Sequence, residues 1–399
     1  MGVIKALDGN AAIAHGVMRS KVQLVAAYPI TPQTPIVETI SSLIDKKEYD
    51  ATYITVESEH SALSAVIGAA SPGVRTFTAS ASHGLALMHE VTGVASASRL
   101  PVVMAVVSRA IPGPMCLWCD HSDIMTQRDQ GWIQLFAESP QEGLDFTMIA
   151  YRTSEDERVL TPTMVDIDGF YCSHLTEPVD VPTEDEAERF ISEFRPVNAQ
   201  LNTDMPYAID NLSSPAIFTE IKRSQDLGMR AAAAVLDERF EEFDKIFGRK
   251  YARVMCDGVE DADTVIVCMG SMSGTVRHVV RQLRSESKKV GIARVVCFRP
   301  FPKTELAEAL RGVKNVAVID RVSAMGSFGP LYEEVLASMK MSGNNANAYS
   351  FVDGLGGRDI WEQTVENVFA KAEEMGARNA PCKEPIWIDL KEDEVLTNG

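Results

Sequence analysis

The chain has 399 residues, of which 45% are hydrophobic and 24% charged, and its formal net charge is −18. This length is sufficient for two or three domains, of which we expect two. The acidic balance argues against nucleic acid or an anionic membrane as a partner, because both are bound through basic patches. No stretch approaches the roughly 20 apolar residues of a membrane span, so a membrane protein is not expected either.

The N-terminus and the cysteines indicate the compartment. Residues 1–8 contain no basic segment followed by a long apolar one, so we expect no secretion signal. The seven cysteines are scattered and odd in number, which is typical of reduced thiols. The sequence therefore predicts a cytoplasmic protein.

Residues 1–175 alternate short apolar runs with helix-like segments, the pattern of a parallel sheet covered by helices. Two helices are expected, at 61–70 and 84–98. The expected strands are 22–27, 53–56, 76–79, 102–107 and 164–166.

A proline-rich segment, Tyr-Pro-Ile-Thr-Pro-Gln-Thr-Pro at 28–35, follows the first of these strands. Its three prolines fix their own φ angles and favour extended geometry at the residues before them. The segment is therefore predicted to be a rigid loop that holds the hydroxyls of Thr31 and Thr34 in place. An ordinary proline-rich turn is the alternative.

The first domain is predicted to span 1–250, with an arm or connector at about 175–250 that contains helices at 184–194 and 217–247. The second domain, 251–399, contains an apparent βαβαβ unit. Its expected strands are 264–269, 289–297 and 316–320, and its expected helices are 275–286 and 304–310.

Several short motifs, taken together in this order and spacing, resemble one family. They are Val-Glu-Ser-Glu-His-Ser-Ala at 56–62, Val-Ser-Arg-Ala at 107–110, Asp-His-Ser-Asp at 120–123, Gln-Arg-Asp-Gln-Gly-Trp-Ile-Gln at 127–134, and the segments 166–170, 177–180, 298–302 and 354–360. Nearly end to end, the chain resembles the alpha subunit of multisubunit pyruvate:ferredoxin oxidoreductases (pyruvate synthases), within the 2-oxoacid:ferredoxin oxidoreductase family.

The resemblance implies an α/β fold with two parts. Domain 1–250 would be the parallel-sheet, pyrimidine-binding module of a thiamine-diphosphate enzyme, and domain 251–399 would resemble the C-terminal domain of transketolases. The implied reaction is the reversible oxidative decarboxylation of pyruvate with coenzyme A to acetyl-CoA and CO2, with electrons passed to ferredoxin.

Thiamine diphosphate is activated when a carboxylic group exchanges a proton with its pyrimidine ring. The family's catalytic glutamate matches Glu59, which follows the expected strand 53–56. Glu57 is the rival, since side chains two residues apart on a strand point in the same direction. A helix-capping acid without catalytic function is the other alternative.

The resemblance places Arg109 on the substrate carboxylate, which a guanidinium grips with two hydrogen bonds, although a lone Arg is more often a salt-bridge partner. It also implies that Thr31 contacts substrate and cofactor, with Tyr28, Pro29 and Ile30 beside it. Thr31 carries no charge, which favours pyruvate over a dicarboxylate such as 2-oxoglutarate.

The only CxxC string is Cys116-Leu-Trp-Cys119. A redox dithiol or half a zinc site is conceivable, with His121 as one extra ligand. Tetrahedral zinc takes four ligands, and the sequence offers no second CxxC or closely spaced His pair. We therefore predict no metal site in this chain and no disulfide between these cysteines.

Two absences are informative. The Gly-Asp-Gly string with a downstream Asn, with which the family holds Mg2+ and the diphosphate, is missing from the sequence, and so is a Cys-rich run for an iron-sulfur cluster. The chain alone is therefore expected to be inactive. The resemblance implies a beta subunit with the diphosphate site, Mg2+ and one 4Fe-4S cluster, a delta subunit with two more clusters, and a gamma subunit that contacts coenzyme A.

Three other functions remain open at this point. The first is a sister enzyme that acts on 2-oxoisovalerate, indolepyruvate or 2-oxoglutarate. The second is a noncatalytic scaffold subunit, and the third is a dithiol oxidoreductase that uses Cys116 and Cys119. We also expect residues 354–359, Gly-Leu-Gly-Gly-Arg-Asp, to form a tight turn at a subunit contact, because paired glycines serve backbone geometry.

Overall fold

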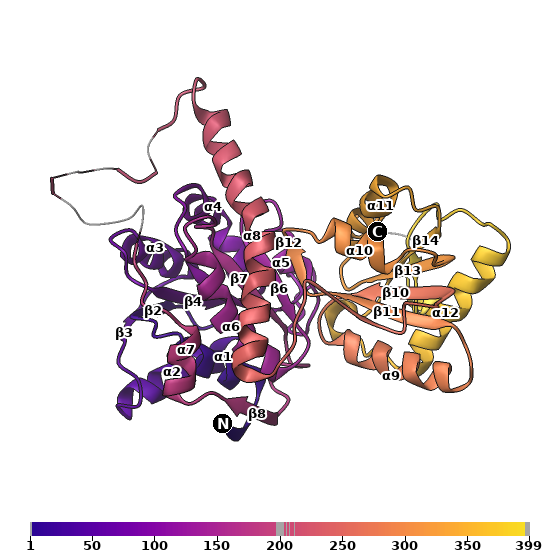
Figure 1. Ribbon diagram of the computed structural model, residues 1–399, viewed down its shortest axis with the longest axis horizontal. Helices are drawn as coiled ribbons and strands as arrows, with labels where there is room; N and C mark the ends of the chain where they lie inside the picture. Colours follow the sequence, from indigo (N-terminus) through magenta and orange to yellow (C-terminus); the bar gives the residue numbers. More distant parts are fainter. Residues whose placement is uncertain (1, 197–202, 205, 207, 211, 396–399) are drawn as a thin grey trace. The chain divides into compact units, whose positions relative to one another are not determined.

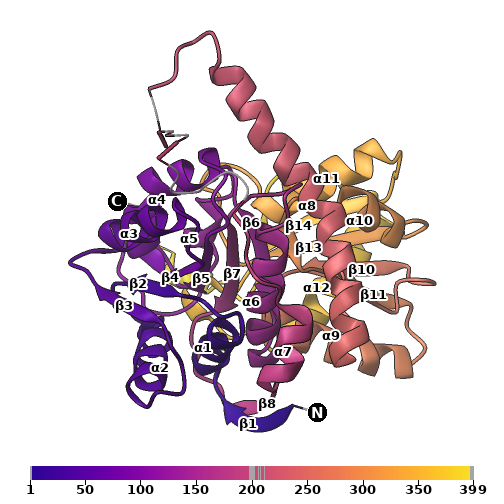
Figure 2. The ribbon, with the colours of Figure 1, turned by 60° about the vertical axis from the view of Figure 1, so that its left-hand side comes forward.

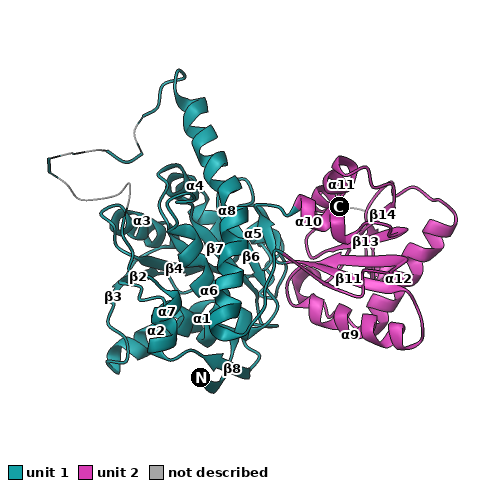
Figure 3. Cartoon of the chain, in the orientation of Figure 1, with its two compact units in different colours: residues 1–253, 296–302 teal, residues 254–295, 303–399 magenta. Residues whose placement is uncertain are grey.

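The computed structural model describes residues 2–196, 203–204, 206, 208–210 and 212–395. Part of the predicted connector, at 197–202, 205, 207 and 211, lies outside these residues. The chain divides into two compact units (Figure 3). Unit 1 comprises Met1–Arg253 and Val296–Pro302, and unit 2 comprises Val254–Val295 and Lys303–Gly399.

Unit 1 is built on a seven-stranded sheet in the order β12-β6-β7-β5-β4-β2-β3. All neighbouring strands are parallel except β12, which runs antiparallel to β6. The strands are β2 (Leu24–Ala27), β3 (Thr52–Thr55), β4 (Thr76–Ser80), β5 (Val103–Ser108), β6 (Ile133–Ala137), β7 (Thr163–Asp168) and β12 (Cys297–Arg299). The five predicted strands are thus confirmed. β6 was not predicted, because a short apolar run does not by itself distinguish a strand from a buried helix segment.

Helices cover both faces of this sheet (Figures 1 and 2). The helices on it are α1 (Gly9–Arg19), α2 (Thr34–Asp45), α3 (Glu59–Ala70), α4 (Ser82–Ala97), α5 (Ser122–Met125) and α6 (Pro140–Ser154). α1 packs against α2 and α6, whereas α3 packs against α4. The predicted helices at 61–70 and 84–98 are confirmed. The predicted proline-rich loop ends two residues earlier than expected, because α2 begins at Thr34.

The predicted connector contributes to unit 1. It contains β8 (Glu177–Val181), which pairs antiparallel with β1 (Val3–Leu7), and the helices α7 (Glu184–Phe190) and α8 (Phe218–Phe247). The prediction that the first of these helices continues to 194 is wrong. The chain becomes extended at Ile191, and the carbonyl of Ser192 accepts a hydrogen bond from the buried Arg75 at 3.0 Å instead of a helical one.

Unit 2 is a six-stranded sheet in the order β15-β14-β13-β10-β11-β9, parallel except for β9. α9 packs against α12 and α10 against α11 (Figure 1). The elements are β9 (Val254–Asp257), β10 (Thr264–Cys268), α9 (Met272–Ser285), β11 (Val290–Val295), α10 (Lys303–Ala309), β13 (Asn315–Asp320), α11 (Pro330–Met341), β14 (Asn347–Val352), α12 (Glu362–Ala377) and β15 (Ile386–Trp387). The predicted βαβαβ unit is confirmed as β10-α9-β11-α10-β13.

One strand of that unit was predicted too long. β11 ends at Val295, where the backbone N–H groups of Val296 and Cys297 both donate to the carbonyl of Arg253. Cys297 then begins β12, which pairs with β6 in the sheet of unit 1. The apolar run predicted as one strand at 289–297 therefore contributes to two different sheets. The hydrophobic pattern alone does not indicate where one strand ends and the next begins.

The tight turn predicted at 354–359 is confirmed. Leu355–Gly357 form a single 3-10 turn, and Gly354, Gly356 and Gly357 have φ angles of 72°, 57° and 76°, which glycine adopts without strain. The proposed subunit contact there stays a prediction. None of the helices that the structure describes combines the length and the apolar character needed to cross a membrane.

Asp320, at the end of β13, gives unit 2 a pH-dependent stability. Its carboxylate is buried and accepts the backbone N–H groups of Leu331 and Tyr332 at 2.9 and 3.1 Å, while burial raises its pKa to about 7. Because the folded state holds this proton more tightly than the unfolded state, the contribution to stability is full below about pH 4 and is lost as the pH rises through about 7.

We therefore expect the difference in unfolding free energy between the parent protein and Asp320→Asn to be larger at about pH 5 than at about pH 8, by on the order of 2 kcal/mol. Urea unfolding at both pH values measures it. An equal difference at the two pH values would contradict the assigned pKa, whatever the absolute cost of the substitution.

Candidate functional site

At the carboxyl edge of the unit 1 sheet, the order of the strands reverses between β2 and β4. β2 and β4 are neighbours, but β2 leads through α2 to β3 on one side and β4 leads through α4 to β5 on the other. In open α/β sheets the loops diverge at such a point and leave a crevice that binds ligands. The predicted Thr31 follows β2, and α3, whose first residue is Glu59, packs on both strands.

Glu59 is buried at the N-terminus of α3. Ser58 caps the helix by accepting the N–H of Ser61 at 3.2 Å, and the Glu59 side chain is left only 7% exposed. Among the residues that the structure describes, the Glu59 carboxylate has no hydrogen-bond partner. A buried carboxylate without a donor is costly. It is therefore suited to a donor supplied by a ligand.

Glu57, the rival carboxylate, has a different environment. β3 ends at Thr55, so the strand alternation that would align it with Glu59 does not apply. Glu57 is exposed, and its Oε1 accepts a hydrogen bond from Ser61 Oγ at 2.6 Å, which lowers its pKa. This solvent-facing acid is satisfied by its own helix turn.

The residues that surround the Glu59 carboxylate are polar and closely packed. A Cβ atom on Gly84 would lie 2.5 Å from Glu59 Oε1 and 2.8 Å from Ser80 Oγ. The hydroxyls of Ser80 and Thr78, both on β4, are fully buried and have no partner within the described part of the chain. Since buried polar groups normally have partners, these hydroxyls point to a polar occupant of the crevice.

The contact with Gly84 gives a test of the site. We expect Gly84→Ala to displace the Glu59 carboxylate and to lower any catalytic activity that depends on this carboxylate at least about 10-fold. Gly68→Ala, inside α3, is the matched control, because a Cβ there meets nothing within 4 Å. Steady-state kinetics on both variants measures the effect, and equal activity in the two would contradict this description of the crevice.

Arg109 follows β5 and lies against the loop that contains Thr31. Its side chain is 2% exposed, and its Nη1 donates to the Thr31 carbonyl at 2.9 Å while Nε donates to the Cys116 carbonyl at 3.0 Å. Among the described residues no carboxylate lies within 4.0 Å of its guanidinium, so Arg109 is not a salt-bridge partner there. A buried cation held by two carbonyls is suited to an incoming anion.

Asp123 connects these loops and was not singled out from the sequence. It is fully buried, and its Oδ2 accepts the backbone N–H groups of Ser82 and Arg109 at 2.7 and 3.0 Å, while Oδ1 accepts that of Ile124 at 2.8 Å. Burial raises its pKa to about 7. The motif 120–123 contained this residue, but its hydrogen bonds reach loops far apart in the sequence and leave no local signal.

The other predicted cofactor contacts lie in the loop between β2 and α2. Ile30 is buried and donates its backbone N–H to Gln33 Oε1 at 3.3 Å, whereas Tyr28 is half-buried and Pro29 and Thr31 are exposed. Gln33 was not predicted. It is fully buried, and its Nε2 has no partner within the described residues.

The CxxC segment, 116–119, lies in the loop between β5 and α5. The structure has no disulfide between Cys116 and Cys119. Cys116 is half-buried and Cys119 is buried. The contribution of Cys116 to the crevice is its backbone carbonyl, which holds Arg109.

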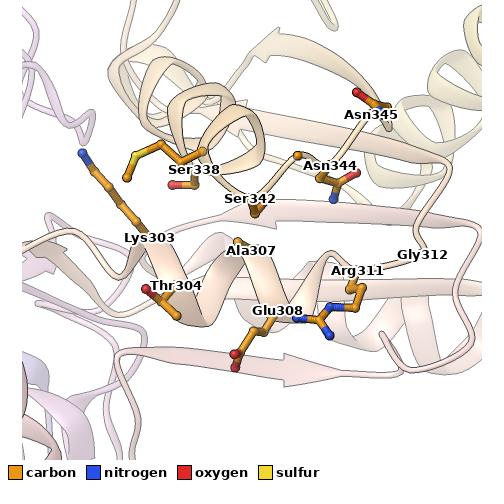
Figure 4. A pocket seen from close by; sticks show the side chains of 12 residues that line it. Lys303, Thr304, Ala307, Glu308, Arg311, Gly312, Ser338, Ser342, Asn344 and Asn345 are labelled. Atoms are coloured by element: carbon orange, nitrogen blue, oxygen red, sulfur yellow. The ribbon is translucent and has the colours of Figure 1, made fainter.

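A separate surface pocket of about 660 Å³ lies in unit 2, between α10 and the end of α11 (Figure 4). Lys303, Thr304 and Arg311 line one side of it, and Ser338 and Ser342 line the other. All predicted site residues belong to unit 1, so this pocket is not part of the candidate site.

Comparison with known proteins identifies the family. Residues 15–241 match the family model described as pyruvate flavodoxin/ferredoxin oxidoreductase, thiamine diphosphate-binding, and residues 262–365 match pyruvate:ferredoxin oxidoreductase core domain II. The chain belongs to the pyruvate:ferredoxin oxidoreductase family. The predicted family membership is confirmed, and the crevice lies within the family's thiamine-diphosphate-binding domain.

Two relatives within the family span nearly the whole chain. Pyruvate synthase subunit PorA of Pyrococcus furiosus is 40% identical over 392 residues, which are 98% of this chain and 99% of the relative. Ketoisovalerate oxidoreductase subunit VorA of Pyrococcus horikoshii is 41% identical over 391 residues, 97% of this chain and 98% of the relative. The first name describes a subunit of a pyruvate synthase and the second a subunit of a ketoisovalerate oxidoreductase.

Solved structures agree with the predicted fold class. A 2-oxoglutarate:ferredoxin oxidoreductase from Magnetococcus marinus is similar with a TM-score of 0.73 at 21% identity, covering 92% of this chain and 65% of that one. A split-gene transketolase is similar with a TM-score of 0.52 at 10% identity, covering 94% and 98%. At these identities the likeness establishes the fold alone, which confirms the predicted α/β, transketolase-like architecture.

Proposed function

We propose that this chain is the alpha subunit of a pyruvate:ferredoxin oxidoreductase, which converts pyruvate and coenzyme A reversibly to acetyl-CoA and CO2 and passes the electrons to ferredoxin. The observation that supports the proposal is the buried carboxylate of Glu59, which has no hydrogen-bond partner among the described residues. It lies where the strand order of the sheet reverses, within the domain that matches the family's thiamine-diphosphate-binding model. Pyruvate synthase is also the name of a relative aligned over nearly the full chain.

The residues of the crevice fit the pyrimidine half of thiamine diphosphate. When bound, this cofactor supplies the carbon nucleophile for a 2-oxo acid. Glu59 would share a proton with the pyrimidine ring, which requires a carboxyl that is shielded from water and not already bonded to the protein. Gly84 leaves space beside its Oε1, and Tyr28, Pro29 and Ile30 would border the cofactor from the loop after β2.

Arg109 and Thr31 would bind the substrate. The guanidinium of Arg109 is buried and has no carboxylate partner among the described residues, so it is available to the carboxylate of pyruvate. Thr31 adds no charge at this point. A second substrate carboxylate would remain unpaired there, which disfavours dicarboxylates.

Partner subunits would complete the enzyme. The sequence contains neither the Gly-Asp-Gly string for Mg2+ and the diphosphate nor a cysteine cluster for iron-sulfur binding. We therefore propose beta, gamma and delta subunits, in a cytoplasmic complex, that supply the diphosphate site with Mg2+, the 4Fe-4S clusters and the contacts to coenzyme A.

A second candidate substrate is favoured by one observation. The ketoisovalerate relative is 41% identical to this chain, which lies within the 39–44% identity of the pyruvate synthase relatives. Overall sequence identity therefore does not decide between pyruvate and 2-oxoisovalerate as the substrate. A measurement of activity with each of them does.

The deciding experiment is anaerobic. The native complex is isolated through a tag on this chain, and coenzyme-A-dependent viologen reduction is measured with pyruvate, 2-oxoisovalerate and 2-oxoglutarate side by side. We expect pyruvate to give the highest kcat/KM. A preference for another 2-oxo acid would change the assigned substrate but leave the proposed mechanism unchanged. No reduction by an intact, cluster-loaded complex would favour a noncatalytic scaffold subunit.

A further inference from the structure

Three buried side chains with metal-binding atoms lie close together near the loop that follows β5. Cys119 and His121 come from the segment before α5, and Asp168 ends β7. Their exposed fractions are 0%, 1% and 0%, and one ligand atom from each lies within 4.8 Å of the others. We propose that these three residues form a binding site for a zinc ion.

The ligand set indicates which metal the site would take. A thiolate and an imidazole are preferred by zinc, whereas Mg2+ and Ca2+ take oxygen ligands almost exclusively. One thiolate and one carboxylate together neutralise a divalent ion. The occupied site would therefore carry no net charge, which is the condition under which burying an ion is tolerated.

The three ligand atoms lie within 4.8 Å of one another, so binding zinc would require shifts of up to roughly 1.5 Å. His121 Nε2 and Asp168 Oδ1 are 2.8 Å apart, a hydrogen-bond distance. Ligand atoms at about 2.0–2.3 Å from a tetrahedral zinc are separated by roughly 3.3–3.7 Å, so the pair would open by less than about 1 Å. The Phe136 ring packs edge-on against His121, with centroids 5.2 Å apart, and forms an apolar wall. The described residues offer three ligands, so a water molecule would have to take the fourth position.

The site went unpredicted because its third ligand is distant in sequence. The segment 116–121 contains one CxxC string and one histidine, but no second CxxC or closely spaced His pair that would indicate a zinc site. Asp168 is brought there by the sheet, since β5 and β7 are paired with Ser108 opposite Asp168. The strand register therefore places a carboxylate beside a loop 47 residues away along the chain.

The proposed ion would anchor the loop that holds Arg109. Ala110 donates its N–H to the carbonyl of Trp118 at 3.1 Å, and Arg109 Nε donates to the carbonyl of Cys116. Zinc bound at Cys119 would fix the end of this loop to β7. Any effect on substrate binding rests on the proposed function, but zinc content does not, so the two can fail separately.

The experiment measures zinc directly in the native complex, purified anaerobically from cells grown with zinc. Elemental analysis is performed on the parent protein, Cys119→Ser and Asp168→Asn, with Cys116→Ser as the matched control from the same CxxC string. We expect about one zinc ion per chain in the parent and in Cys116→Ser, and at least about a fivefold loss in the other two. The iron content of each preparation shows whether the complex is intact.

A measurement on the parent complex avoids dependence on variants that fail to fold. Zinc-edge X-ray absorption should give one sulfur neighbour at about 2.3 Å and nitrogen or oxygen neighbours at about 2.0–2.2 Å. An iron-loaded parent complex without zinc would overturn the proposal and leave the hydrogen-bonded pair of His121 and Asp168. Full zinc content in Cys119→Ser would overturn it as well.

Discussion

Glu59→Gln in the assembled complex is expected to lower kcat with pyruvate by at least about 100-fold, because an amide does not exchange a proton with the cofactor's pyrimidine ring. Glutamine has nearly the same volume, and Glu59 makes no described hydrogen bond that the amide would break. Assembly should therefore be unchanged. Anaerobic viologen reduction at saturating pyruvate and coenzyme A measures the effect.

Glu57→Gln is the matched control for this variant. It makes the same chemical change two residues away, on an exposed side chain whose only described partner is Ser61. We expect its kcat to stay within about twofold of the parent, as is usual for surface substitutions. Equal loss in both variants would point to damage at the start of α3, and full activity of Glu59→Gln would remove the catalytic assignment and favour the scaffold reading.

The sheet of unit 1 was largely predictable because its strands are short apolar runs separated by helix-like segments. β5, for example, is buried at all six positions and lies within one residue of the strand predicted at 102–107 from the apolar run. The strand predicted at 289–297 failed for a different reason. Its last residues leave one sheet for another, and that exchange is decided by pairing with β6, which lies far away in the sequence.

The candidate site divides in the same way. Glu59, Arg109 and Thr31 lie in short motifs beside strand ends, so sequence patterns and family resemblance were enough to select them. Asp123 was not selected, because its role is to accept N–H groups from two other loops. Asp168 is a similar case, since only the pairing of β5 with β7 brings it to His121.

Arg109→Ala is expected to lower kcat/KM for pyruvate by about 100-fold, which corresponds to about 2.7 kcal/mol of lost transition-state binding. Its guanidinium is the buried cation that would pair with the substrate carboxylate. Alanine would leave the negative charge of the substrate without a partner. Arg109→Lys should recover part of the loss, because an ammonium keeps the charge but not the two-pronged hydrogen bonding. Initial rates over a range of pyruvate concentrations measure both variants.

The KM for coenzyme A separates a substrate contact from a loosened loop. Arg109 also donates to the carbonyls of Thr31 and Cys116, so its removal releases two loops as well as a charge. If substrate binding is its role, kcat/KM for pyruvate falls, Arg109→Lys is intermediate, and the KM for coenzyme A is unchanged. If the side chain only holds the loops together, lysine and alanine should be equally impaired and the complex should unfold at a lower temperature. That pattern would leave the pyruvate carboxylate to be bound by another residue.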